Sequence, residues 1–170
     1  MIRIQVATTA DAALIADLSQ QTFYETFASQ NTKEDMDKFM NEQFSKEALI
    51  KEVGEPGNIF LLAYDGDEAV GYVRMREGEK RSEFENKSSI EIARIYAVQS
   101  SIGKGVGKAL MKQCLITAVA NQIEIIWLGV WEENNRAIRF YQQWGFEKFA
   151  EHDFILGNDR QTDWLMKKEL

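Results

Sequence analysis

The sequence VQSSIGKGVGKAL, from Val98 to Leu110, contains three glycines, Gly103, Gly105 and Gly107, within five residues. It follows a strand-like run and continues directly into helix-forming sequence. Glycine is a poor choice for a helix start selected for stability alone, because it loses the most backbone entropy on folding. A helix start also presents N–H groups without internal partners and the positive end of the helix dipole. Removing Cβ atoms at such a start lets an anion approach the backbone closely.

The stretch therefore has the parts of a pyrophosphate cradle, with Lys104 and Lys108 adding positive charge on either side of Val106. The alternative is a tight turn between strand and helix, because a glycine-rich turn alone is weak evidence. Two familiar phosphate motifs do not fit. Ala109 stands where a P-loop has Ser or Thr, and the glycines lie past mid-chain rather than after the first strand of a dinucleotide-binding unit.

Length and composition indicate one globular domain over residues 1–170, with 45% hydrophobic and 28% charged residues. The opening MIRIQVA lacks the basic start and apolar middle of a signal peptide, and no apolar run approaches the roughly 20 residues of a membrane helix. A lone cysteine, Cys114, excludes an internal disulfide and favours a reducing cytoplasm. It repeats with the apolar face of its helix, so we expect a core position rather than a nucleophile.

The formal net charge of −7 argues against direct nucleic-acid binding, which needs clustered Lys and Arg. An acidic protein attracts cations, so the charge favours a positively charged substrate. Solubility alone is the competing explanation.

Periodicity and turn signals predict a mixed order of strands and helices. We expect strands at 2–7, 58–64, 68–75, 88–98, 123–131, 146–156 and 161–170, two capped helices between residues 8 and 44, and further helices at 45–53, after 103 and at 133–144. This order is neither a regular βαβ repeat nor an all-β pattern. It indicates one α+β or α/β sheet with helices on both faces.

A second chemistry-bearing stretch is WEENNRAIRFYQQWGFEKF, residues 131–149. Asn134 lies near the predicted N-cap, and Ala137 and Tyr141 follow at spacings that put all three on one helix face. Gly145 suits the position just after the helix. Taken alone, the stretch favours an amphipathic core position for Tyr141, and Asn134 could equally be a simple cap.

Together the two stretches resemble the acetyl-CoA-binding signature of the GNAT N-acetyltransferase superfamily. V-x-x-x-x-G-K-G-V-G-K-x-L is similar to its pyrophosphate loop, and N-x-x-A-I-x-F-Y-x-x-x-G-F to its second motif. The family usually has Gln or Arg where this chain has Ile102, a departure of little weight for a cradle made of backbone N–H groups. Residues 22–44, 90–98 and 154–170 further resemble bacterial spermidine/spermine acetyltransferases described as regulators of sporulation and protease production.

The resemblance implies a three-layer α+β fold, with a mixed central sheet of about seven strands and helices on both faces. Its central strand, here 88–98, is bulged and splays from 123–131 to open a cleft for acetyl-CoA. The implied cofactor-binding residues are Tyr96, Ala97 and Val98 for the pantetheine arm, Gly103, Lys104, Gly105, Val106, Gly107 and Lys108 for the pyrophosphate, and Asn134. A backbone N–H near Val98 would polarise the thioester carbonyl.

In the implied reaction an amine attacks the thioester, and the tetrahedral intermediate expels the thiolate, which Tyr141 protonates or hydrogen-bonds. An alkylamine with a pKa of about 10.4 is neutral in only roughly one molecule in 2,500 at pH 7, so a base is needed. Glu91, on the presumed central strand, is the candidate base, with a solvent-facing role as the alternative. His152 is a lesser candidate, and Tyr24 and Glu25 are candidates for the acceptor side.

The expected function is therefore acetyl transfer from acetyl-CoA, a co-substrate, to a primary amine such as spermidine or spermine. Acetylation of a protein N-terminus, a lysine or an aminoglycoside, or non-catalytic sensing of CoA, are the alternatives. We expect no metal, no membrane association and no nucleic-acid partner, and the family is compatible with a homodimer.

Overall fold

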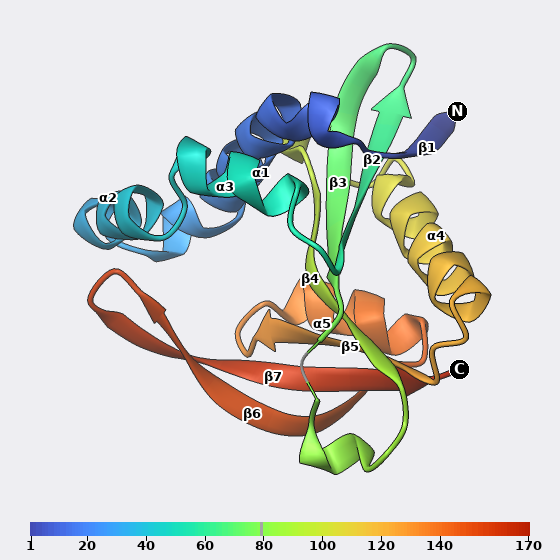
Figure 1. Cartoon of the computed structure of the whole chain (residues 1–170). Helices are drawn as coiled ribbons and strands as arrows, with labels where there is room; N and C mark the ends of the chain where they lie inside the picture. The colour runs from blue at the N-terminus through green and yellow to red at the C-terminus, as the bar shows by residue number, and fades with distance from the viewer. Residues whose placement is uncertain (79) are drawn as a thin grey trace.

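The computed structural model describes residues 1–78 and 80–170. One seven-stranded sheet has the order β1-β2-β3-β4-β5-β7-β6 (Figure 1). Its strands are β1 (Ile2–Val6), β2 (Asn58–Asp65), β3 (Glu68–Arg76), β4 (Ser89–Ala97), β5 (Ile125–Trp131), β6 (Glu147–Leu156) and β7 (Asp159–Glu169). The α-helices are α1 (Ala12–Phe27), α2 (Lys33–Glu42), α3 (Lys46–Val53), α4 (Val106–Ala120) and α5 (Asn135–Gln143). Within the described ranges, no helix combines the length and apolarity needed to cross a membrane.

Local signals explain where these elements begin and turn. Thr32 caps α2 by accepting a hydrogen bond from the backbone N–H of Asp35 at 3.1 Å, and Ser45 caps α3 in the same way. The hairpin that joins β2 to β3 closes at Asp65, which pairs with Glu68. The capped helix expected before residue 44 and the strands expected at 58–64 and 68–75 are thus confirmed.

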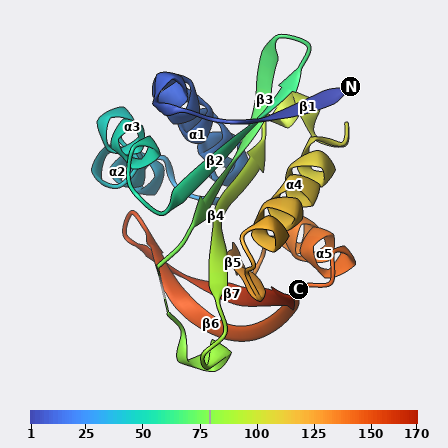
Figure 2. The same ribbon diagram turned by 45° about the vertical axis from the view of Figure 1, so that its right-hand side comes forward.

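The helices lie in two layers on opposite faces of the sheet. Helices α1–α3 cover one face, and α4 and α5 cover the other (Figure 2). The main core lies around the sheet and α4, where Cys114 is fully buried as expected. A second apolar cluster, made largely of Phe side chains such as Phe23, Phe39 and Phe44, joins α1 to α2 and α3. The two layers confirm the predicted three-layer arrangement.

The parallel pair β4–β5 is short and opens at one end. It runs only from Ser89 opposite Ile125 to Ile92 opposite Leu128. At the same point the register between β4 and β3 shifts, because Met75 pairs with Ile92 while Arg74 pairs with Arg94. The extra residue on β4 makes a bulge that bends the strand away from β5. The predicted bulged and splayed central strand is confirmed.

Candidate active site

Two adjoining cavities, of about 810 and 710 Å³, lie where β4 and β5 separate. Both are lined by the side chains of Thr26, Phe27, Ala97, Ile102, Trp131, Asn134, Arg136 and Phe140. We call the two together the cleft. Because opposite walls of the cleft come from opposite faces of the sheet, two ligands can enter from opposite sides and meet where β4 and β5 separate.

The start of α4 forms one end of the cleft. Gly105 is the N-cap residue, with a left-handed φ of 87°, and Gly103 has a φ of 84°. A Cβ built at either glycine would meet no atom within 4 Å, so both positions open onto free space. No side chain caps this helix, which leaves the first N–H groups of α4 without protein partners. Bare backbone, open space and free donors fit a pyrophosphate.

The predicted loop residues divide between cleft and core. Gly103, Gly105, Gly107 and Lys108 line the larger cavity. The side chain of Val106 is 1% exposed and belongs to the core under the loop. Lys104 is exposed and lines neither cavity, so its side chain is not brought to the site.

The edge of β4 supplies backbone groups in a different register from the one expected. The N–H of Val98 donates to the carbonyl oxygen of Val70 at 2.9 Å, so this amide faces β3 and not the opening. Antiparallel pairing turns alternate peptides to opposite sides. The peptide groups of Ala97 and Ile95, both of which line the larger cavity, therefore face the splay. Tyr96 lines it with its side chain, which stacks on Tyr72.

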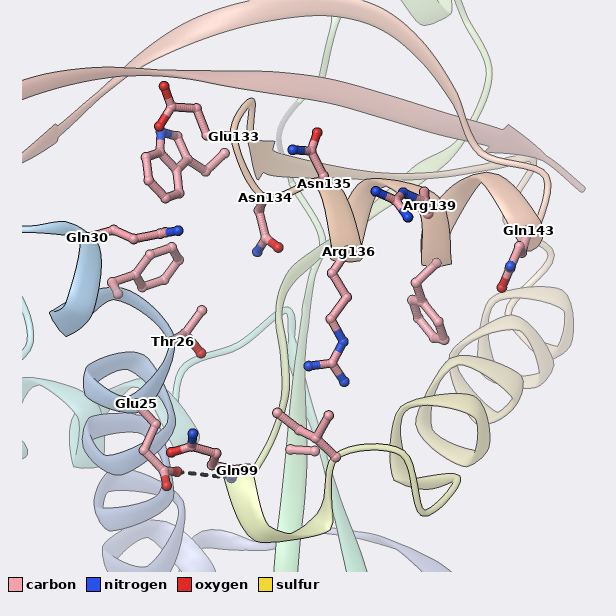
Figure 3. A pocket seen from close by; sticks show the side chains of 15 residues that line it. Glu25, Thr26, Gln30, Gln99, Glu133, Asn134, Asn135, Arg136, Arg139 and Gln143 are labelled. Carbon is pink, nitrogen blue, oxygen red and sulfur yellow. Dashed lines mark hydrogen bonds between the residues drawn. The ribbon is translucent and has the colours of Figure 1, made fainter.

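The start of α5 forms the wall opposite the loop. Asn134 caps the helix by accepting a hydrogen bond from the N–H of Ala137 at 3.2 Å. Figure 3 shows Asn134 and Arg136 reaching from this end of α5 into the smaller cavity, opposite Glu25 of α1. Asn134 is therefore both a cap and a lining residue, and the two interpretations of its role are compatible.

Tyr141, also on α5, lines the larger cavity and is 8% exposed. Burial raises the pKa of its hydroxyl above the ordinary value, and the nearby Cys114 thiol adds to the effect. Burial likewise raises the pKa of Cys114 to about 12. At neutral pH Tyr141 is thus a protonated hydrogen-bond donor, and Cys114 is a neutral thiol packed in the core.

The remaining sequence candidates lie in contrasting places. Glu25 lines the smaller cavity, where its carboxylate accepts from the N–H of Gln99 at 3.3 Å (Figure 3). Tyr24 precedes Glu25 but lies on an outer face of α1. It is 50% exposed and lines neither cavity. Glu91 also lines neither cavity and lies in the paired part of β4, opposite Trp127. Both Nε and Nη2 of Arg76 donate to its Oε1, at 2.9 and 2.5 Å. The geometry does not bring Tyr24 or Glu91 to the cleft.

Several lining residues escape sequence reasoning. Arg74, Arg94 and Glu52 line the larger cavity from β3, β4 and α3, and Asp163 lines it from β7. His152 pairs with Asp163 across β6 and β7, with Nε2 3.4 Å from Oδ2. Burial raises the pKa of the Asp163 carboxyl, although His152 acts against this. The available signal was the presence of charged residues inside otherwise apolar strands, as at Arg94.

Comparison with known proteins places these features in a family. The model of the Acetyltransferase (GNAT) family matches residues 20–146. An uncharacterized N-acetyltransferase from the region 3′ of pepI in Lactobacillus delbrueckii subsp. lactis is 37% identical over 153 residues, covering 90% of this chain and 88% of that protein. The spermine/spermidine N(1)-acetyltransferase of Bacillus subtilis is 33% identical over 95 residues, 55% of this chain and 61% of that protein.

Solved structures agree on the fold. The PaiA N-acetyltransferase of Thermoplasma acidophilum, solved in complex with coenzyme A, superposes with a TM-score of 0.79 at 20% identity. The match covers 100% of this chain and 99% of that one.

Proposed function

Because the chain belongs to the GNAT acetyltransferase family and is an acetyl-CoA-dependent N-acetyltransferase, we propose that it transfers the acetyl group directly to the primary amine of a small molecule. The observation that carries the proposal is the position of the splay. It lies between the uncapped, glycine-bearing start of α4 and the protonated hydroxyl of Tyr141. Acetyl-CoA held by its pyrophosphate at this start would supply the activated acetyl group at the splay.

The peptide groups of Ala97 and Ile95 are the backbone donors and acceptors that face this point. An N–H there can stabilise negative charge on the thioester oxygen as the amine attacks. Asn134 and Arg136 extend the polar wall along the cofactor side. We assign cofactor binding to these groups together with Gly103, Gly105, Gly107 and Lys108.

Tyr141 acts on the leaving thiolate. A thiol has an ordinary pKa of about 8.5, and burial holds the pKa of Tyr141 above its ordinary value of about 10. Complete proton transfer from the tyrosine to the thiolate is therefore uphill. A short hydrogen bond donated by the hydroxyl stabilises the thiolate without that transfer.

Within the class of small primary amines, a polyamine such as spermidine or spermine is a specific candidate acceptor. The partial similarity to the Bacillus subtilis enzyme and the net charge of −7, which attracts cations, favour it. We keep Glu91 as a base only for an acceptor that displaces Arg76 from its carboxylate.

The test is a panel of primary amines with acetyl-CoA, followed by thiol release and by the mass of the acetylated product. The panel contains amino acids, polyamines, an aminoglycoside and a lysine peptide. We expect turnover with at least one small amine. Tight CoA binding with no turnover on any amine would contradict transfer and favour a CoA-sensing module.

A further inference from the structure

Three arginines line the larger cavity on the face covered by α1–α3. They are Arg74 and Arg76 of β3 and Arg94 of β4. Their side chains are 8%, 42% and 14% exposed, so two of them are largely buried and one is open to the cavity. Guanidinium groups present rigid, paired donors that match a carboxylate. We call these three the arginine wall.

The carboxylates beside the arginine wall do not balance it. Glu52 accepts from both Nη atoms of Arg94, at 2.8 Å each, and also lies 3.2 Å from Nη1 of Arg74. The carboxylate of Glu91 forms an ion pair with Arg76. Three guanidiniums against these two paired carboxylates leave one positive charge, which the exposed carboxylate of Glu55 offsets in part at Arg74.

The surplus positive charge affects Arg74, which is the most buried of the three arginines. The pKa of Arg74 is lowered, first by burial, and the like charges of Arg94 and Arg76 act in the same direction, against Glu52 and Glu55. The remaining partner of its Nε is neutral, the amide oxygen of Asn58 at 3.0 Å. A positive charge kept in such surroundings is stabilised by an anion that arrives with the ligand.

The opposite wall carries a negative group. Asp163 of β7 is 16% exposed and lines the same cavity. Its Oδ2 would lie 3.7 Å from a Cβ built on Gly129, which is the first residue of β5 beyond the parallel pairing. The carboxylate therefore stands beside the splay, where the amine must attack, and the arginine wall stands across from it on β3 and β4.

Much of the remaining lining of this cavity is aromatic. It includes Phe23, Phe27, Phe39, Phe44, Phe154 and Trp131. A chain of methylenes or an aromatic ring would pack against these side chains. A polyamine, in contrast, would bring further positive charge toward the arginine wall.

We propose, building on the acetyl transfer proposed above, that the acceptor is a primary amine that also bears a carboxylate, as an amino acid does. Its amine faces Asp163, and its carboxylate faces the arginine wall through the exposed guanidinium of Arg76. Asp163 accepts one proton from the ammonium, and the neutral nitrogen then forms a bond to the acetyl carbon. The carbon–sulfur bond of the thioester breaks, and the surplus proton on the new amide nitrogen passes to the departing thiolate.

The test compares amino acids with their amides as acceptors at pH 8. Conversion to the amide removes the negative charge and also lowers the pKa of the amine. At pH 8 a larger fraction of the amide therefore has a neutral amine, so the protonation state alone would make the amide the better acceptor. We expect kcat/KM to be at least about tenfold higher for the free acid, a difference that one charge-assisted hydrogen bond can supply. Cadaverine beside lysine repeats the comparison on a skeleton that lacks the carboxylate entirely.

The matched variants are Arg76→Gln and Arg3→Gln. Arg76 is exposed enough to be replaced without opening the buried pair of Arg94 and Glu52. Arg3 is an exposed arginine of β1 that lines neither cavity. We expect Arg76→Gln to reduce the preference for the free acid about tenfold while the KM for acetyl-CoA stays unchanged, Arg76→Lys to restore part of it, and Arg3→Gln to have no effect.

The outcomes separate the two proposals. Turnover that is equal or faster with amides, or fastest with polyamines, overturns the carboxylate assignment and leaves acetyl transfer intact. Absence of turnover with every amine, despite binding of CoA, overturns the proposed function itself. An Arg76→Gln protein with unchanged thermal unfolding and unchanged preference removes Arg76 from the acceptor site.

Discussion

The proposed cofactor side and the proposed acceptor side of the cleft are built in opposite ways. The cofactor side consists mainly of backbone, with glycines at the start of α4 and the free peptide edge of β4 near Ala97. The acceptor side consists of side chains, such as Glu52, Arg94 and Asp163, that come from α3, β4 and β7. One side binds through groups that every residue carries, and the other binds through groups that a single substitution can change.

This difference teaches where specificity lies in the fold. A backbone cradle needs only the absence of side chains, so it can keep one cofactor through large changes elsewhere. A wall of side chains from separate elements can be rebuilt residue by residue for a new acceptor. The predictions below treat the two sides as independent and are ordered by the size of the expected effect.

The largest effect is expected at Glu52, because Glu52→Gln leaves two mostly buried guanidiniums without their shared carboxylate. Breaking such a pair destabilises a protein by about 3 kcal/mol. Urea unfolding measures the loss, with Glu55→Gln, an exposed neighbour, as the control. Affinity for CoA should be unchanged at temperatures where the variant is folded. A parallel loss of CoA affinity would break the independence of the two sides.

Tyr141→Phe is expected to lower kcat about 100-fold, because the thiolate loses its hydrogen-bond donor while the ring keeps its packing. Steady-state thiol release gives kcat, and calorimetry gives the dissociation constant of CoA, which should stay the same. Tyr64→Phe, on β2 and outside both cavities, is the control. A fully active Tyr141→Phe enzyme would remove this residue from the reaction.

Gly105→Ala and Gly66→Ala form a matched pair for the cradle. Both glycines have positive φ, 87° and 62°, and a Cβ at either would meet nothing within 4 Å. Each substitution should therefore destabilise the fold by a similar 1–2 kcal/mol, roughly the strain of a left-handed L-residue. Only Gly105→Ala should raise the KM for acetyl-CoA, by about tenfold, because its methyl group enters the space expected for the pyrophosphate. Equal KM values in the two variants would contradict the cradle.

The smallest effect is a pH-dependent gain in stability at Asp163. Its folded-state pKa is raised by burial, so the stabilising contribution of its protonated form is present below the ordinary carboxyl pKa and is lost as pH rises through the raised value. Asp163→Asn should therefore raise Tm by on the order of 2 °C at pH 7 and leave it unchanged at pH 3. Acetyl transfer should fall in the same variant. A drop in Tm at pH 7 would show that the His152 contact outweighs the burial of the carboxylate.

The fold was predictable because its signals are local. Caps such as Thr32, the hairpin at Asp65 and the glycine run before α4 each act through neighbouring residues. The bulge at Ala93 was expected only from the family resemblance, since no residue type in β4 marks it. Periodicity predicts that a strand exists and not where its ladder slips.

On the proposed cofactor side, the sequence predicted which side chains lie together. Asn134 and Tyr141 share one helix, so spacing brings them together. Glu91 was expected at the cleft because it lies on β4, but its side chain is held by Arg76 of β3. The roles of Arg76 and Asp163 depend on pairing between strands far apart in the chain, which a single sequence does not reveal. Residues separated along the chain meet only through the sheet order.

The four residue pairs between β4 and β5 have a mechanical consequence. Among the described residues this short ladder is the only strand pairing that joins β1–β4 to β5–β7 (Figure 1). The two parts of the sheet are thus held together by this ladder and by the core packed against both, and the cleft lies at the open end of the ladder. Amide hydrogen exchange at Ile90 and Ile92 would measure how often the β4–β5 ladder opens. A cofactor that contacted both β1–β4 and β5–β7 would restrain their relative motion, and the acceptor would then bind in a cleft of fixed width.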